Sequence, residues 1–304
     1  MKKIISRLLI FFIGLPAIVA VVLLLPQSNH LALNILTIIF SALGAIELSG
    51  MLAQKQLKIS KAEAAIMGAL QPASMYLIIA FDLNPLLLPA VTVASVSWLL
   101  ISQIFLQGSV LENFIKRFAA GCAVLLYPGM LLTWLVRLSR WDNIVYSSPN
   151  QLLNISFSGV ATLIFLLTVF CGDSTAWAAG MLFGKGNQGI VPVSPNKSIA
   201  GFIGGFAASV GVGVLAALLL PEIFRPQRGS ILAIPAVSGV ILGLTTGIAA
   251  TLGDLGESAI KRSTGLKDSG NIIPGRGGVL YSIDSVSLAA PVYYIMYSLL
   301  FVQP

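Results

Sequence analysis

The sequence predicts an all-α, polytopic integral membrane protein. Of its 304 residues, 57% are hydrophobic and only 10% are charged, and the mean hydropathy is +0.93. Runs of about 17 or more apolar residues with few charges indicate transmembrane helices, because about 20 helical residues cross the hydrocarbon core of a bilayer. About nine such runs occur, near residues 5–25, 31–52, 64–81, 85–105, 118–138, 157–183, 199–220, 231–252 and 286–302.

The basic residues predict which ends of these helices face the cytoplasm. With a cytoplasmic N-terminus, fourteen of the eighteen Lys and Arg residues fall on the inner side, and the outer side keeps Arg137, Arg140, Arg225 and Arg228. An excess of Lys and Arg in cytoplasmic loops is typical of membrane proteins. We therefore expect a multi-pass protein of the cell (cytoplasmic) membrane with its N-terminus inside.

Neither an internal repeat nor a long linker is visible, so we expect a single membrane domain over residues 1–304. Residues 1–150 are expected to form a helical scaffold, and residues 151–304 to carry the chemistry, with cytoplasmic loops at 184–198 and 253–285. The first half has one acid inside an expected span, Glu47. A carboxylate within a membrane span is costly unless it is paired or hydrated. Glu47 lies near the interface, however, which also suits a structural role in which the carboxylate snorkels to water.

The stretch from Gly253 to Ser285 is the most densely charged part of the chain. It holds four of the eleven acidic and four of the eighteen basic residues, between two membrane-length apolar segments. Charge is expensive to keep beside lipid, so such a cluster indicates a functional site.

The first part of this stretch predicts a helix with one polar face. Asp254, Glu257, Ser258 and Lys261 follow the spacing i, i+3, i+4 and i+7, which places them on one stripe. Two carboxylates, with Asp173 if the helices meet, would suit Mg²⁺, which prefers oxygen ligands and shares its shell with phosphates. The same stripe could instead be a solvated face whose acids and bases pair with each other.

Two further segments of the chain supply groups that could bind anions. In the loop 184–198, Ser194 and Lys197 precede an apolar run, and the start of the following helix is itself a possible anion site. Further on, Arg262, Lys267 and Arg276 flank a glycine-rich turn that could wrap a polyphosphate. Acids for a metal and bases for phosphates are the groups that phosphoryl or nucleotidyl transfer requires, although an ion-coupled transporter could use them too.

These residues resemble the signature of the phosphatidate cytidylyltransferases (CDP-diacylglycerol synthases), which reads roughly S-x-x-K-R, four residues, K-D, and a P-G-H-G-G-x-x-D-R-x-D ending. The positions that match it in order and spacing are Ser258, Lys261, Arg262, Lys267, Asp268, Pro274, Gly275, Gly277, Gly278 and Asp284. Asp173 with Ser174, Ser194 and Pro195 with Lys197, the Gly253–Glu257 segment and the surroundings of Glu47 are also similar to the family.

Four positions depart from the family pattern. Arg276 replaces the histidine, which keeps a cation. Tyr281 and Ser282 stand where the family has Asp-Arg, and Ala200 replaces a glutamate. The missing acid matters most, because in the family it is thought to help hold the metal. A phenol, with a pKa near 10, stays protonated and is a poor ligand for a hard cation.

The resemblance implies attack by a phosphatidate phosphate oxygen on the α-phosphorus of CTP, with pyrophosphate leaving. The implied metal ligands for Mg²⁺ are Asp173, Asp254, Glu257 and Asp284. The implied catalytic residues are Lys261, Arg262, Lys267 and Asp268, and Asp268 could position a lysine, hold a second cation or contact the nucleotide. The implied substrate-binding residues are Ser194, Lys197, Ser258 and Arg276.

Three hypotheses therefore stand at this point: an active cytidylyltransferase, a divergent or inactive relative, and a membrane transporter. The expected partners are CTP, phosphatidate in the inner leaflet and membrane lipid, with no nucleic acid. The resemblance also implies a homodimer, and the span that contains Gly201, Gly204, Gly205 and Gly211 could supply the interface.

Overall fold

The structure is a computed structural model that describes residues 14–102, 104, 113–140, 156–225, 234–270, 272–273 and 277–301. Most of the described residues are helical, and their only β-type pairings are the isolated bridges Gln188–Ser198 and Ile273–Gly277. This confirms the predicted all-α class. Arg276, a predicted substrate-binding residue, and the start of the first expected span lie outside the described residues.

Seven of the described helical segments are long and apolar enough to cross a membrane. They are α3 (Gln27–Ala53), α4 (Lys61–Phe81), α7 to α8 (Phe114–Leu138), α9 (Phe157–Phe183), α10 (Ile199–Leu219), α11 (Pro235–Thr264) and α12 (Leu280–Phe301). Two shorter helices, α2 (Leu15–Leu24) and α5 (Leu87–Ile101), fall in the first and fourth expected runs. The polytopic architecture is confirmed, while the exact number of spans stays a prediction.

The chain divides into two compact units. The N-terminal unit comprises residues 1–140 together with Ile260–Ile283, and the C-terminal unit comprises residues 141–259 and 284–304. Most of the charged segment that follows Ala259 therefore packs with the N-terminal helices, although it lies far along the chain.

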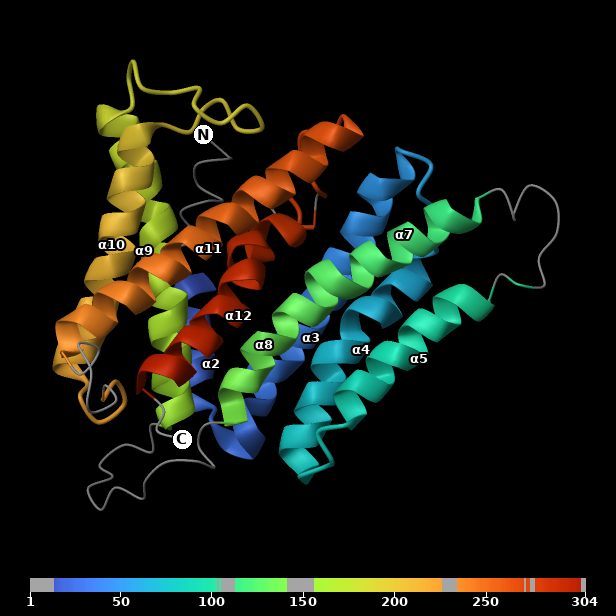
Figure 1. Ribbon diagram of the computed structural model, residues 1–304, viewed down its shortest axis with the longest axis horizontal. Helices are drawn as coiled ribbons and strands as arrows, with labels where there is room; N and C mark the ends of the chain where they lie inside the picture. The colour runs from blue at the N-terminus through green and yellow to red at the C-terminus, as the bar shows by residue number, and fades with distance from the viewer. Residues whose placement is uncertain are drawn as a thin grey trace. The chain divides into compact units, whose positions relative to one another are not determined.

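In the N-terminal unit, α3, α4, α5 and the α7–α8 rod lie side by side (Figure 1). The rod joins α7 (Phe114–Val124) to α8 (Leu131–Leu138) through the π-helical segment η2 (Leu125–Met130), which contains Pro128. Proline has no N–H and disturbs the regular i to i−4 ladder. The Ser41 hydroxyl lies 2.9 Å from the Pro128 carbonyl oxygen and 2.6 Å from that of Gly68, so it ties α3 to both neighbours.

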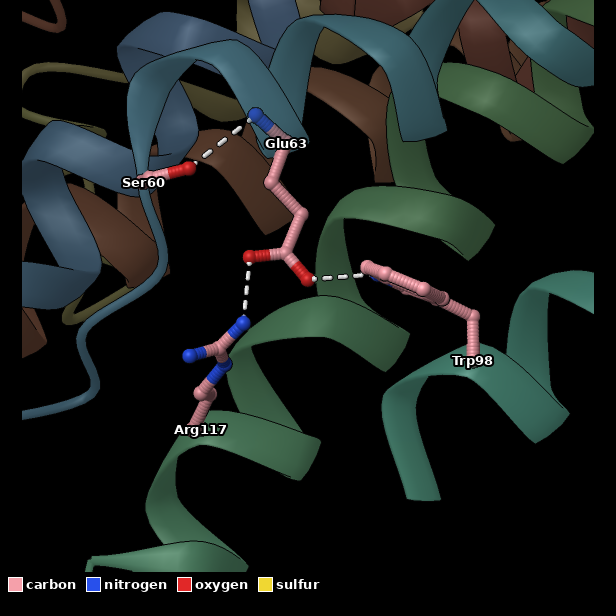
Figure 2. Close-up of polar contacts among 4 residues, drawn as sticks. All are labelled: Ser60, Glu63, Trp98 and Arg117. Atoms are coloured by element: carbon pink, nitrogen blue, oxygen red, sulfur yellow. Dashed lines mark hydrogen bonds and ion pairs between the residues drawn. The ribbon is translucent and has the colours of Figure 1, made fainter. Parts of the chain in front are cut away.

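A polar contact joins three of these helices at their ends. Ser60 caps α4 by accepting a hydrogen bond from the Glu63 backbone N–H (3.1 Å). The Glu63 carboxylate accepts from Trp98 Nε1 of α5 (3.2 Å) and Arg117 Nη2 of α7 (2.8 Å), as Figure 2 shows. Both residues therefore bind one carboxylate.

In the C-terminal unit, α9 and α10 pack closely through small residues. A side chain on Gly172 would collide with the Ser209 hydroxyl, and one on Gly205 would meet Ala176 and the Gly172 carbonyl. Gly201 and Gly204 likewise pack against α9, whereas Gly211 has open space beside it. The prediction that these glycines serve a dimer interface is therefore wrong for Gly201, Gly204 and Gly205, since all three are used inside the chain. Small residues let helix backbones approach in membranes.

Candidate active site

Acidic side chains gather around Asp284 in the C-terminal unit. Asp284 lies in α12, which begins at Leu280 rather than near residue 286, and it is almost fully buried. Asp254 and Glu257 of α11 and Asp173 of α9 all interact electrostatically with it. Three of the predicted metal ligands thus lie within electrostatic range of the fourth, Asp284.

A glycine allows this gathering. A Cβ atom on Gly253 would collide with the backbone carbonyl of Asp284, so α11 and α12 touch where Asp254 follows in the chain. Only glycine permits so close a backbone approach. The pairing of a glycine with the following acid was a sequence signal for this contact, but spacing alone did not show which helix the glycine would meet.

The donor set around Asp284 suits a hard cation. Asp284 Oδ1 accepts a hydrogen bond from the Ser285 backbone N–H (2.5 Å), while its buried Oδ2 has no hydrogen-bond partner among the described residues. A buried polar atom without a partner costs about 1–3 kcal/mol, and more if it is charged. Oxygen ligands on several carboxylates are what Mg²⁺ prefers. Within the part of the chain that the structure describes, however, no three such groups lie close enough together to hold a metal as they stand.

Lys197 forms an ion pair with one of these acids, Asp254. Its Nζ lies 2.5 Å from Asp254 Oδ2 and 5.7 Å from the centre of the Phe202 ring. The next residue, Ser198, caps α10 by accepting from the Gly201 N–H (3.1 Å). Ser194 is half-buried in the preceding turn, where its carbonyl accepts from the Lys197 N–H (3.1 Å). The loop therefore holds the Lys197 side chain against Asp254.

The basic segment belongs to the N-terminal unit. Helix α11 ends at Thr264, and Gly265 follows with a positive φ of 76°. The Leu266 N–H donates to the Lys261 carbonyl (2.9 Å), which is the pattern of a Schellman cap. The cap ends the helix two residues after Arg262, and Lys267 and Asp268 are exposed in the segment that follows.

Tyr281, the main departure from the family pattern, contacts a predicted catalytic residue. The Nζ atom of Lys261 lies 4.8 Å from the centre of the Tyr281 ring, which is within the range of a cation–π interaction. Lys261 is buried and Tyr281 is 41% exposed. The residue that replaces an acid therefore still faces a cation. Ser258 is also buried on α11, whereas Ala200 lies in the first turn of α10.

Glu47 has contacts with a distant part of the chain that sequence reasoning missed. Its two carboxylate oxygens accept hydrogen bonds from the backbone N–H groups of Val279 (2.9 Å) and Leu280 (2.8 Å), at the start of α12. A carboxylate is well suited to these unpaired donors at the positive end of a helix. Side chains on Gly270 or Gly278 would collide with the Glu47 carboxylate. The snorkelling interpretation is therefore wrong, because Glu47 is buried and its hydrogen bonds join the start of α12 to α3.

The fold and the site define a class: a polytopic membrane protein in which clustered carboxylates and a capped basic turn are set on the same long helix, α11. Comparison with known proteins agrees with that class. A model of the cytidylyltransferase family matches residues 5–300. The chain belongs to this family.

Several curated relatives bear the name phosphatidate cytidylyltransferase, and three of them are compared below. The protein from Brucella abortus is 34% identical over 215 residues, which is 68% of this chain and 74% of the relative. The protein from Haemophilus influenzae is 37% identical over 145 residues, covering 46% of this chain and 47% of its own length. The Bacillus subtilis protein is 34% identical over 151 residues, covering 49% and 52% respectively.

Proposed function

We propose that this chain transfers the cytidylyl group of CTP to phosphatidate, forming CDP-diacylglycerol and pyrophosphate. A phosphate oxygen of the lipid attacks the α-phosphorus of CTP, and the bond to the β-phosphate oxygen breaks. Support comes from membership in the cytidylyltransferase family, from the names of its relatives and from a site that combines carboxylates with cations. Family membership also favours an enzyme over the transporter hypothesis.

The reaction needs little proton transfer, because the attacking phosphate is already an anion. The barrier comes mainly from repulsion between the anionic lipid, CTP and the leaving pyrophosphate, so catalysis depends on positioned positive charge. Lys261 and Arg262, with Lys267 after the Schellman cap, would bind phosphate oxygens. Lys197 would exchange part of its contact with Asp254 for a phosphate. Arg276, Ser194 and Ser258 are further candidates for substrate contacts.

The carboxylates Asp173, Asp254, Glu257 and Asp284 would hold Mg²⁺. The single observation that carries this assignment is the buried Asp284 Oδ2, which has no hydrogen-bond partner among the described residues and has three other acids in its electrostatic neighbourhood. When bound, Mg²⁺ would neutralise charge on the phosphates. Asp254 and Glu257 precede Lys261 and Arg262 on α11, so one continuous helix supplies both metal ligands and phosphate-binding cations.

The remaining assignments complete the proposal. The N-terminus would be cytoplasmic, which places the loops 184–198 and 253–285 on the side where CTP is available. Phosphatidate would come from the inner leaflet of the cell membrane. A homodimer remains part of the proposal, and its interface would lie on surfaces other than the α9–α10 contact. Asp268, which is exposed in the loop, would position a lysine, hold a second cation or contact the nucleotide.

The test is an assay of the purified full chain in detergent–lipid micelles with CTP and phosphatidate. We expect Mg²⁺-dependent release of pyrophosphate together with a lipid-linked CDP product, and EDTA should abolish both. Absence of the lipid-linked product with folded protein would refute the function.

Two matched pairs of variants test the site. Asp254→Asn should lower kcat by at least about a hundredfold, a loss typical for a group that stabilises transition-state charge, whereas Glu222→Gln should leave it unchanged. Lys197→Met should impair the enzyme, and Lys185→Met in the same loop should not. Equal effects within either pair would remove that residue from the site.

A further inference from the structure

An apolar groove of about 400 Å³ lies in the N-terminal unit. Its walls come from Leu48 and Leu52 of α3, Ala123 of α7, Leu126 and Met130 of η2, and Ile260 of α11. Figure 1 shows α3 lying alongside the α7–α8 rod that contains η2. We call this cavity the η2 groove. Its volume is in the range of small-ligand sites, which lie between about 300 and 1,000 Å³.

The π-helical segment contributes exposed side chains to the groove. Leu126 and Met130 line it and are 50% and 43% exposed, although they lie in the middle of a candidate membrane span. Exposed apolar side chains at that depth face hydrocarbon. Single π-helical turns inside α-helices occur frequently at functional sites, because they interrupt regular packing. The groove is therefore accessible sideways from the lipid phase.

The groove also has a direction. Leu52 lies in the last turn of α3, and Ile260 lies in the last two turns of α11, so one end is near the helix ends. From Ala123 to Leu131 the rod rises by about 12 Å at 1.5 Å per residue, so the other end reaches well into the span. An apolar groove that extends from near the helix ends into the span has a lining that suits an acyl chain.

Two cations follow one of the groove residues directly in the chain. Ile260, which lines the groove, is followed directly by Lys261 and Arg262. A ligand that complements both features has a hydrocarbon chain and an anionic headgroup. We propose that the η2 groove binds one acyl chain of the phosphatidate substrate while Lys261 and Arg262 hold its phosphate. This inference rests on the proposed function and adds the place where the lipid is bound.

The kinetic test fills the groove and compares long-chain with short-chain substrate. Ala123→Phe should raise KM for dioleoyl phosphatidate by roughly tenfold, the equivalent of about two methylenes withdrawn from burial. The KM for dihexanoyl phosphatidate should rise less, by about twofold at most, because a six-carbon chain buries fewer methylenes along the groove, and the KM for CTP should stay within about twofold. Ala94→Phe is the matched control, since Ala94 is exposed on α5 and does not line the groove; it should change none of these values.

Two kinetic outcomes overturn the proposal. An unchanged KM for the long-chain substrate in Ala123→Phe would mean that the substrate does not use the groove. Equal losses with long and short substrates would mean that the substitution disturbs the fold instead. In both cases the unaltered protein would still convert dihexanoyl phosphatidate, so the proposed function would survive the failure of the groove.

A binding test keeps the proposal falsifiable if Ala123→Phe does not fold. The unaltered protein is irradiated with phosphatidate that carries a diazirine in the middle of one acyl chain. We expect the label on the peptide that contains Leu126 and Met130. Unlabelled phosphatidate that is present during irradiation should reduce this labelling at least fivefold more effectively than phosphatidylcholine does. Equal displacement by both lipids would indicate ordinary bilayer lipid in the groove, and absence of the label from this peptide would indicate that another helix or nothing occupies it. Either result refutes the proposal.

Discussion

Replacement of Tyr281 should reveal how this chain works without the acid expected at that position. Lys261 Nζ lies 4.8 Å from the ring centre. A cation–π interaction contributes about 0.5–1 kcal/mol when exposed and about 2 kcal/mol when desolvated. Lys261 is 8% exposed and Tyr281 is 41% exposed, so this pair lies between the two limits. We take about 1 kcal/mol, which corresponds to about a fivefold change in an equilibrium or rate.

Tyr281→Leu removes the ring and should lower kcat/KM for CTP by about fivefold, because about 1 kcal/mol of cation–π stabilisation is lost. Tyr281→Phe keeps the ring and should retain nearly full activity. The measurement is steady-state release of pyrophosphate by the purified variants, with thermal unfolding recorded in parallel to show that each is folded. Equal losses in both variants would assign the role to the hydroxyl, and an unchanged Tyr281→Leu would refute the cation–π argument.

Tyr281→Asp distinguishes the active-enzyme hypothesis from the impaired-relative hypothesis. If the missing acid limits the chain, the aspartate should raise kcat sharply, because a carboxylate would be regained beside the phosphate-binding cations. If the tyrosine already positions Lys261, the change should leave kcat unchanged or lower it. A sharp rise would contradict the view that Tyr281 is a working substitute.

Three further predictions concern the contacts that hold the site. Glu47→Ala should lower the free energy of unfolding by about 2 kcal/mol, because two buried N–H donors lose their acceptor; Gly270→Ala should also destabilise, and thermal melts that match the unaltered protein would contradict both. The double-mutant cycle of Lys197→Met with Asp254→Asn should give a coupling of about 1 kcal/mol or more in the activation free energy, and strict additivity would show that their contact does not persist during turnover. Glu63→Gln should cost about 1 kcal/mol of stability through the contacts to Arg117 and Trp98 without changing KM for CTP, so an altered KM would contradict a purely structural role.

Much of the fold was predictable because it depends on local properties of the chain. Hydropathy predicted the spans, and the described helices α3, α4, α9 and α10 begin and end within a few residues of the predicted runs. Ser198 stands directly before an apolar run, which is the pattern of a helix cap, and it caps α10 in the structure. The start of α12 was placed too late, because Asp284 and three serines lower the hydropathy of its first turns although the backbone there is helical.

The candidate site was predictable in its residue types but less so in its contacts. The signature indicated which acids and bases matter, and the spacing on α11 indicated a common face. The link from Glu47 to Val279 joins residues separated by 232 positions, and no periodic pattern carries such a contact. Likewise, a glycine at 253 shows that something approaches closely, but it does not show that the neighbour is the Asp284 backbone.

The sequence by itself determined the class of this protein, since membrane helices, charge placement and family signature are all properties of composition and spacing. Only the tertiary structure decided which groups meet: the acids around Asp284, Lys197 on Asp254, Tyr281 beneath Lys261, and Glu47 at the start of α12. The physical reason is that hydropathy and helical periodicity act between neighbouring residues. Pairing between distant residues depends on how closely the helices pack, which the glycines permit but do not specify.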